Sequence, residues 1–290
     1  DNGYDRTEYM NITVGDVSRS DPMGPNPNGY YIYDSGDVDY ELAPVYDWIE
    51  IADDLGEPLN IVDYGNGNYS GSYTYSSEVI DLPFIFTFYG VDYTQIIVNT
   101  NGWISFGDFK MYSFRNYPLP GAGGPSPMVA AFWDDLKTGS GGYIHYYEAD
   151  DKVVIQWDDM RTYDGNSRET FEIILFNKEL FSSTVTGDSE IKIQYQEFNN
   201  TSDGYYPNGG TPTHGCYSTV GIENSMGDTG LQYTFNNTYS EAAARLENGS
   251  AIFISTGRLP RVNLSLENVD LSNGLLDIHI DTDEDIAGFQ

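Results

Sequence analysis

The sequence predicts an all-β fold in which antiparallel sheets pack as a sandwich. Aromatic residues make up 15 % of the 290 residues, and 25 residues are tyrosine. Aromatic and β-branched side chains fit a pleated sheet, and the 31 glycines suit tight turns between short strands. Only the stretch 241–245 resembles a helix, and it is barely one turn long.

Residues 1–29 form the first segment, a strand arm followed by a proline-rich linker. Met10, Ile12 and Val14 alternate with polar residues, which is the period of a half-buried strand. The Pro- and Gly-rich stretch 21–29 then interrupts any helix or ladder. Such a strand either folds back as an edge strand of its own domain or pairs with a neighbouring molecule. Met10, Ile12 and Val14 are therefore candidate assembly residues.

Residues 30–257 form the main body, where strand-like runs recur between Gly-, Asn- and Asp-rich turns. In the clearest run, Ile191, Ile193 and Tyr195 alternate with polar residues. The run 173–176 is apolar at every position, so we expect it at the centre of a sheet. The regular spacing predicts a sandwich. The expected strands are 48–51, 79–89, 95–98, 102–106, 128–133, 142–147, 152–157, 170–176, 190–195, 217–222 and 251–255.

The last segment, residues 258–290, has the pattern of a new β unit. Two alternating runs flank a Ser272-Asn-Gly274 turn, and their apolar positions are Val262, Leu264, Leu266, Leu276, Ile278 and Ile280. A lone hairpin is marginally stable in water. The pattern therefore predicts either the start of a second β domain or a hairpin that docks on something else.

Several spaced motifs of the main body resemble the nidogen-like β-sandwich, which is also jelly-roll-like. They are Leu82-Pro-Phe-Ile-Phe-Thr-Phe-Tyr-Gly90, Ile97-Val-Asn-Thr-Asn-Gly-Trp-Ile-Ser-Phe-Gly107, Pro127-Met-Val-Ala-Ala-Phe-Trp-Asp-Asp-Leu136, Thr170-Phe-Glu-Ile-Ile-Leu175, Ile191-Lys-Ile-Gln-Tyr195, Thr219-Val-Gly-Ile-Glu-Asn224 and Gly230-Leu-Gln-Tyr233. The resemblance covers roughly 30–257, and it is closest to bacterial relatives in large secreted or cell-surface proteins. The segment from Asn268 to Gln290 resembles the opening of a cohesin-like β domain.

The resemblance implies a non-catalytic structural or adhesive role outside the cell or at its surface. Because the chain begins at Asp1 without a signal peptide, we expect a processed piece of a longer precursor. Our main hypothesis is self-assembly through the terminal strands into a surface fibre or larger assembly. The partners would be other copies or neighbouring domains of the same precursor. In such proteins these modules often follow a secreted peptidase domain, so the alternative is an accessory domain that binds substrate or glycans.

The charge excludes several partners. The formal net charge is −32, from 45 acidic and 13 basic residues. This field repels nucleic acid and anionic membranes. No run of about 18 apolar residues is present, so we expect no membrane insertion.

No residue pattern points to catalysis. The spacing of the three histidines, His145, His214 and His279, is not that of metal ligands. The single cysteine, Cys216, is predicted to be a small buried hydrophobic residue on a strand. Adjacent acids at 134–135 and 158–159 would face opposite sides of a strand, so they are poor general acid/base pairs for glycoside hydrolysis. We therefore expect that the chain is not an enzyme.

Calcium is the more plausible chemistry, since clustered Asp oxygens in flexible turns suit this hard cation. The candidate ligands form two clusters, Asp34, Asp37 and Asp39 around Gly36, and Asp281, Asp283 and Asp285 near the C-terminus. Neither has EF-hand spacing, and solvated acidic turns are the alternative.

Seven Asn-X-Ser/Thr sequons make the chain a candidate glycoprotein. The candidate acceptors are Asn11, Asn68, Asn199, Asn200, Asn236, Asn248 and Asn263. A cluster of tyrosines has two interpretations, a platform for sugars or partners and simple packing on the sheets. Its members are Tyr30, Tyr31, Tyr33, Tyr73 and Tyr75.

Overall fold

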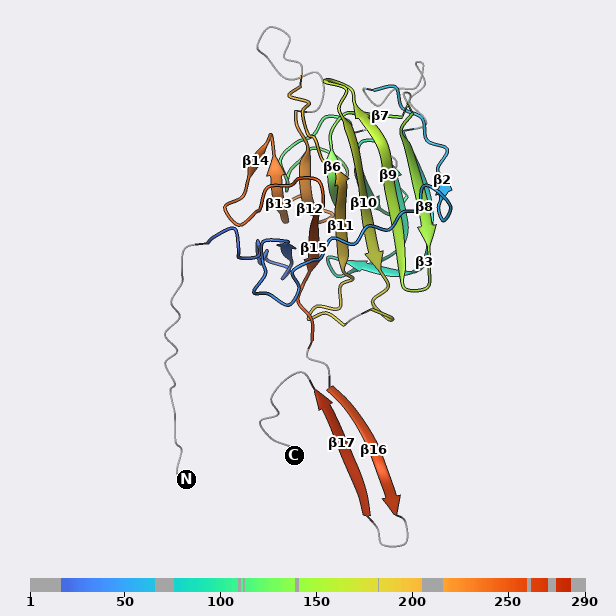
Figure 1. The fold of residues 1–290 in the computed structure, drawn as a ribbon, viewed down its shortest axis with the longest axis vertical. Helices are drawn as coiled ribbons and strands as arrows, with labels where there is room; N and C mark the ends of the chain where they lie inside the picture. The colour runs from blue at the N-terminus through green and yellow to red at the C-terminus, as the bar shows by residue number, and fades with distance from the viewer. Residues whose placement is uncertain are drawn as a thin grey trace.

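The computed structural model describes residues 17–65, 76–108, 111, 113–138, 141–181, 183–204 and 216–259, together with the backbone of strands 262–270 and 275–282. The described residues contain no helix, and their strands form two antiparallel sheets packed as a sandwich plus a separate pair (Figure 1). The predicted fold class is therefore confirmed. The stretch 241–245 begins with a turn and continues without regular structure, so the helical interpretation is wrong.

Sheet I has the strand order β1-β15-β11-β10-β9-β8-β2, with β7 also paired to β9. Its strands are β1 (Tyr31–Asp34), β15 (Ser250–Ser255), β11 (Ile191–Glu197), β10 (Arg168–Phe176), β9 (Lys152–Thr162), β8 (Tyr143–Glu148), β2 (Glu57–Pro58) and β7 (Leu136–Lys137). The strand β10 contains the run that is apolar at every position, and it is central in the sheet as predicted.

Sheet II has the order β14-β13-β12-β6-β5-β4-β3. Its strands are β14 (Thr238–Tyr239), β13 (Gly230–Phe235), β12 (Thr219–Glu223), β6 (Met128–Trp133), β5 (Trp103–Phe106), β4 (Val91–Asn99) and β3 (Ser77–Phe88). Five strands were not predicted from the sequence, namely β1, β2, β7, β13 and β14. Three of these strands, β1, β2 and β14, end a sheet. Most of the five are very short, so they carry too few alternating residues to be recognised.

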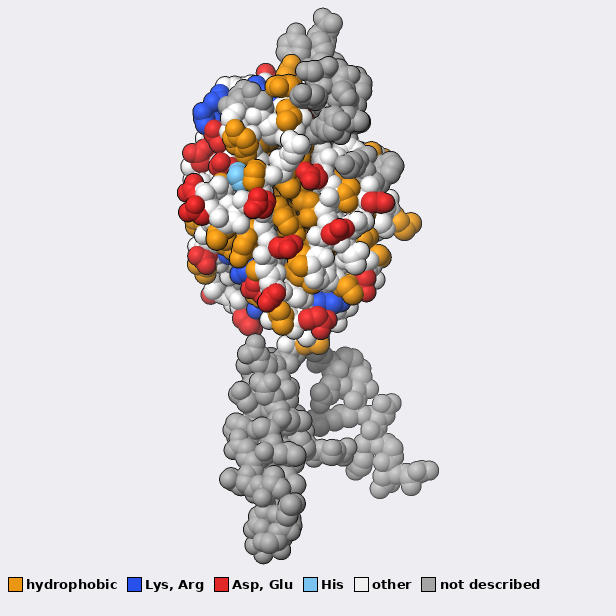
Figure 2. All heavy atoms as spheres, turned by 90° about the vertical axis from the view of Figure 1, so that its right-hand side faces the viewer, with side chains coloured by type: hydrophobic (Ala, Val, Ile, Leu, Met, Phe, Trp, Pro, Cys, Tyr) orange, Lys and Arg blue, Asp and Glu red, His pale blue; other side chains and the backbone are white. Residues whose placement is uncertain are grey.

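The sheet edges carry features that discourage pairing with another sheet. The edge strand β3 is long, but its register shifts between Asp81 and Phe86, where Pro83 supplies no N–H. Asp81 and Pro83 are exposed. Figure 2 shows the side on which β2, β3 and β8 lie, with acidic side chains scattered between apolar ones. The strands β2 and β14, at two other edges, have two residues each.

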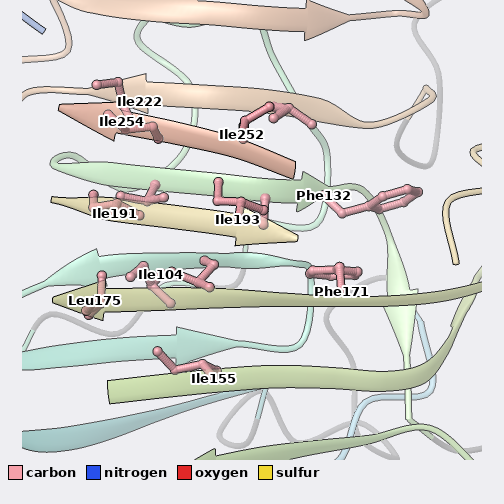
Figure 3. Packing of buried hydrophobic residues seen from close by; sticks show 14 of the residues in the cluster. Ile104, Phe132, Ile155, Phe171, Leu175, Ile191, Ile193, Ile222, Ile252 and Ile254 are labelled. Atoms are coloured by element: carbon pink, nitrogen blue, oxygen red, sulfur yellow. The ribbon is translucent and has the colours of Figure 1, made fainter. Parts of the chain in front are cut away.

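The core lies between the two sheets, and inward side chains from both meet there (Figure 3). Ile191, Ile193 and Tyr195 of β11 are fully buried, as their alternation predicted. Their labelled neighbours in Figure 3 include Phe171 and Leu175 from sheet I. Those from sheet II include Ile104, Phe132 and Ile222. Burial of such side chains contributes about 1.5–3 kcal/mol each, so this layer is the main stabilising feature of the fold.

A strap, residues 41–56, crosses the outer face of sheet I (Figure 1). The strand expected at 48–51 is wrong, because this part of the strap pairs with side chains rather than with another strand. Three strap N–H groups donate to a polar row on the sheet: Asp47 to Gln194 Oε1 (2.6 Å), Ile49 to Glu172 Oε1 (3.4 Å) and Ile51 to Gln156 Oε1 (3.0 Å). These side chains are opposite one another in the register of β11, β10 and β9.

A second segment, the described residues between 113 and 127, covers the outer face of sheet II. The indole N–H groups of Trp103 and Trp133 both donate to the Ser113 carbonyl, at 3.2 and 2.6 Å. The Leu119 N–H donates to Gln232 Oε1 (2.9 Å). Both sheets are therefore covered on their outer faces, which explains why residues on both faces of the central strands are buried.

The C-terminal hairpin is present as β16 (Val262–Asp270) paired antiparallel with β17 (Leu275–Thr282). The register places Leu264 opposite Ile280 and Leu266 opposite Ile278, as alternation predicted. No described strand of the sandwich pairs with this hairpin. The candidate assembly residues Met10, Ile12 and Val14 lie outside the described residues.

Candidate functional site

A groove of about 420 Å³ lies on the outer face of sheet I beside the strap. Three sheet residues line it, namely Phe176 of β10, Lys192 of β11 and Phe253 of β15. Strap residues 41–47 line it as well, together with Phe181 and Arg258. The groove thus combines aromatic rings, two cations and the strap carboxylates.

Arg258 is held in place by a buried carboxylate. Its Nε and Nη2 donate to Glu190 at 3.0–3.2 Å, and Glu190 Oε1 also accepts from the Ser255 hydroxyl (2.7 Å). The guanidinium lies 5.0 Å from the ring centroid of Phe181 and 5.5 Å from that of Phe253, within cation–π range. These contacts fix the guanidinium, paired with the Glu190 carboxylate, among the rings of the groove.

Lys192 stands in an otherwise apolar row across sheet I. In the register its neighbours are Phe253 on β15 and Ile174 on β10. Burial lowers the pKa of the Lys192 ammonium, and the nearby carboxylates of Asp47 and Glu172 act in the opposite direction. A charge in this position loses part of its hydration, so it favours an anionic partner.

Aromatic side chains flank these cations. Phe176 and Phe181 stack with ring centroids 3.9 Å apart, and they close one wall. Tyr46 and Trp48 follow one another at alternate positions of the strap, and both are partly exposed. Their ring centroids lie 6.5 Å apart with an interplanar angle of 23°. This arrangement suits binding of a ligand that has both polar and apolar surfaces.

The first calcium cluster is largely occupied by internal hydrogen bonds. Asp34 is buried, and its Oδ2 accepts from the Tyr233 hydroxyl and from a backbone N–H, each at 2.8 Å. Its Oδ1 accepts from the Gly36 N–H (2.7 Å). Asp37 Oδ2 accepts from the Asp34 N–H (2.8 Å), and burial raises the pKa of Asp37 to about 6. Asp39 is exposed. Asp34 therefore fastens its turn to the β13 side of the sandwich.

In the part of the chain that the structure describes, no three His, Cys, Asp or Glu side chains group as metal ligands do. Only the backbone of Asp281 is described, and Asp283 and Asp285 lie outside the described residues. Calcium binding at either cluster stays a prediction.

The sequons differ in exposure. Asn199, Asn236 and Asn248 are exposed, so a glycan has space at each. Asn200 is buried and its Oδ1 accepts from the Ser218 N–H (2.7 Å), so burial disfavours a glycan there. Only the backbone of Asn263 is described, and Asn11 and Asn68 lie outside the described residues.

Two members of the tyrosine cluster, Tyr30 and Tyr33, are packed into the sandwich. Tyr30 is fully buried, with ring centroids 5.6 Å from Phe88 and 4.6 Å from Tyr89. Tyr33 is also buried, and Tyr31 is partly buried beside it. Tyr73 and Tyr75 lie outside the described residues. For Tyr30 and Tyr33 the packing interpretation is confirmed.

The adjacent acids at 134–135 do not face opposite sides of a strand. Both follow the end of β6, and both are buried. Asp134 Oδ1 accepts from the Asp135 N–H (2.7 Å), and burial raises the pKa of the Asp134 carboxyl well above its usual range. Leu136 donates its N–H to Asn101 Oδ1 (3.0 Å). Two of the motifs noted in the sequence therefore hold one another at this end of the sandwich.

The remaining reactive residue types are scattered. His145 lies buried on β8, only the backbone of His279 is described, and His214 lies outside the described residues. Cys216 is buried as predicted but precedes β12 instead of lying on it, and its Sγ is 3.0 Å from Asn236 Oδ1. No helix long and apolar enough to cross a membrane occurs among the described residues.

Sequence reasoning missed the groove. Its one local signal is Lys192, a charge between isoleucines on a strand whose alternation otherwise looks ordinary. Nothing local shows that the strap, Phe181 and Arg258 come together with this residue, since they are far apart in the chain.

Comparison with known proteins agrees with the sandwich. Residues 66–258 match the family described as NIDO related. The chain is also similar to alpha-tectorin of Mus musculus, with 32 % identity over 82 residues. That match covers 28 % of this chain and 4 % of alpha-tectorin, so the chain corresponds to a small part of that relative. No solved structure matches. Because the family match spans most of the sandwich, this chain belongs to the NIDO-related family.

Proposed function

We propose that this chain is a non-catalytic structural or adhesive module of an extracellular or cell-surface protein. The observation that carries the proposal is the NIDO-related match over residues 66–258, together with the local similarity to alpha-tectorin. The conspicuous buried carboxylates support it, because the contacts of Asp34 and Asp134 tie segments of the fold together.

The module assembles with other copies, or with neighbouring domains of its precursor, through its terminal strands. The sandwich and the C-terminal hairpin differ in how open their edge strands are to pairing, and this difference supports the proposal. Those of the sandwich are shortened or interrupted, as at β2 and at Pro83 of β3, which discourages strand addition. The pair β16–β17 has no third strand among the described residues, and two strands alone are marginally stable. Strand addition at the chain ends would provide the missing partners and build a fibre.

The test is a matched pair of variants of the full chain. Met10, Ile12 and Val14 are replaced by Ser in one variant, and Asn11 and Thr13 are replaced by Ser in the other. The first should lose its assemblies by light scattering and negative-stain imaging, while the second keeps them. Near-ultraviolet circular dichroism should show a folded sandwich in both. Assemblies of unchanged size in the first variant would exclude a role for the arm.

A second candidate function is favoured by the groove at Lys192 and Arg258. In this version the module is an accessory domain of a secreted multidomain peptidase, and it attaches the protein to substrate or glycan. Aromatic rings next to fixed charges are a common lining of ligand sites. Binding of the isolated chain to an immobilised glycan array would support this function, whereas no binding to any glycan or substrate protein would exclude it.

The C-terminal hairpin segment has a proposal of its own. The segment 258–290 would be the opening of a cohesin-like β domain in a bacterial surface protein. A longer version of the polypeptide should then protect the amides of β16 and β17 from hydrogen exchange far better than this chain does. Equal protection would mean that the hairpin is complete as it stands.

A further inference from the structure

The groove brings two cations, Lys192 and Arg258, together with two strap carboxylates, Glu41 and Asp47, on a strongly acidic molecule. The chain has 13 basic residues against 45 acidic ones, yet Lys192 and Arg258 line the same groove. Arg258 is fixed by its two-pronged contact with Glu190 and by the rings of Phe181 and Phe253. Because Glu190 already neutralises the Arg258 guanidinium, and the carboxylates of Glu41 and Asp47 lie on the strap side, Lys192 is the cation in this groove that is available to a small anionic group.

Lys192 has carboxylates in its neighbourhood but no direct contact with one among the described residues. Its ammonium makes no ion pair within 4.0 Å and no hydrogen bond among the described residues, although it is partly buried in an apolar row. A partly desolvated ammonium gains most from a charge-assisted hydrogen bond to a carboxylate or similar anion. The Lys192 side chain lines the groove, so an anion in the groove can reach it.

The strap argues against an extended peptide as the occupant. The Asp47 N–H donates to Gln194 Oε1 (2.6 Å), and the Asp47 carbonyl accepts from Gln194 Nε2 (2.6 Å). The backbone at this point is therefore already paired and offers no ladder for an added strand. The strap instead presents side chains: the partly exposed rings of Tyr46 and Trp48, and the exposed carboxylates of Glu41 and Asp47.

We propose that this groove binds an acidic glycan, one whose sugar rings carry a carboxylate as a hexuronate does. Lys192 Nζ binds the sugar carboxylate, with the Arg258–Glu190 pair beside it. Tyr46 of the groove lining packs against the apolar face of a sugar ring, and Glu41 and Asp47 accept hydrogen bonds from hydroxyls. The proposal rests on the accessory binding function above and is independent of assembly through the terminal strands.

The experiment compares trigalacturonate with neutral galactotriose by titration calorimetry on the full chain. Each ligand is titrated into the unchanged protein, into Lys192→Met and into the control Lys137→Met. Met keeps the length of Lys and suits the apolar row, and Lys137 lies on β7 with its ammonium over Tyr163. We expect trigalacturonate to bind the unchanged chain more tightly than galactotriose. Lys192→Met should weaken trigalacturonate binding about tenfold, equivalent to about 1.4 kcal/mol, and Lys137→Met should leave it unchanged.

Other outcomes overturn the proposal in distinct ways. Equal affinity for the charged and the neutral trisaccharide would leave the accessory function standing and remove the carboxylate site. Equal loss in both lysine variants would show only a general charge effect. Equal or tighter binding of a triglutamate peptide would assign the groove to an acidic peptide instead of a sugar. Melting temperatures of all variants, measured in parallel, separate loss of binding from loss of folding.

Discussion

Glu172 shows how a single buried side chain ties the strap to sheet I. It is fully buried on β10, where its Oε1 accepts from Gln194 Nε2 (2.6 Å) and from the Ile49 N–H (3.4 Å). Burial raises the pKa of Glu172 to about 8, because the charged form loses its hydration. At neutral pH the carboxyl is therefore largely protonated in the folded state, although it is ionised in the unfolded chain.

This difference sets a pH dependence. The folded chain keeps the Glu172 proton up to about pH 8, whereas the unfolded chain loses it near the ordinary value of 4.5. The stability due to this group is therefore complete below about pH 4.5 and is lost as the pH rises towards 8. In urea unfolding, the free energy of unfolding of the unchanged chain should fall by an amount on the order of 2–4 kcal/mol across that window. Glu172→Gln should not show this fall, because its amide does not titrate. Glu197→Gln, at a partly exposed position of β11, should change little. Parallel pH profiles for unchanged chain and Glu172→Gln would contradict the assignment.

Gly102 matters for a steric reason. Its φ is +74°, and a Cβ at this position would collide with the carbonyl oxygen of Phe132. Gly90 has a similar φ of +72°, but a Cβ there would meet open space. Gly90→Ala should therefore cost only about 1 kcal/mol of backbone strain, and Gly102→Ala should cost at least about 3 kcal/mol in denaturant unfolding. Equal costs would mean that backbone strain accounts for both.

At the scale of elements, the two covering segments explain why this sandwich buries polar side chains on its outer faces. Gln194, Glu172 and Gln156 face outward in the alternation of their strands, and an uncovered sheet would leave them in water. The strap buries them and its backbone N–H groups donate to them. On sheet II, Gln232 accepts from the Leu119 N–H in the same manner. Side-chain oxygens of the strands thus accept backbone N–H groups of the covering segments, as the carbonyls of a neighbouring strand would.

Removing one such amide should release one segment and leave the other in place. Gln194→Ala removes both hydrogen bonds to Asp47. Hydrogen exchange at the Asp47 amide should therefore become at least about tenfold faster, because the free energy of local opening falls by about 1.4 kcal/mol. Gln232→Ala should accelerate exchange at Leu119 instead. Each variant is the control for the other. Simultaneous acceleration at both sites would show that the segments open only with the whole sandwich.

For the molecule as a whole, the net charge of −32 is the dominant electrostatic fact. Self-repulsion of this size opposes the compact state and separates copies from one another. Screening at about 0.15 M salt shortens its range to about 8 Å. Counter-cations bound at specific carboxylates would act more strongly than screening, which is the physical basis for the calcium prediction.

Chelation tests that prediction directly. At constant ionic strength, replacing calcium by a chelator should lower the melting temperature, because a ligand that binds only the folded state stabilises it. Asp281→Asn combined with Asp283→Asn should remove a calcium effect that arises in the hairpin. Asp39→Asn should remove one that arises in the β1 turn. Identical melting curves with calcium and with chelator would exclude both clusters.

A structural feature could be predicted from the sequence when it depends only on neighbouring residues in the chain. Alternation is local, so β11 and its buried face could be predicted from Ile191, Ile193 and Tyr195, and β10 could be placed centrally from its apolar run. The run 48–51 has the same composition as a strand but lies across the sheet. Its partners are side chains about a hundred residues away, and no period of its own reveals them.

The all-β sandwich, the hairpin after it and the acidic character could therefore be predicted from residue type and period alone. Three features became visible only in the folded chain: the strap covers sheet I, Asp134 is buried, and Lys192 shares a groove with Arg258. The physical reason is that burial and pKa depend on what packs against a residue. Those neighbours come from segments whose approach is set by the topology of the two sheets.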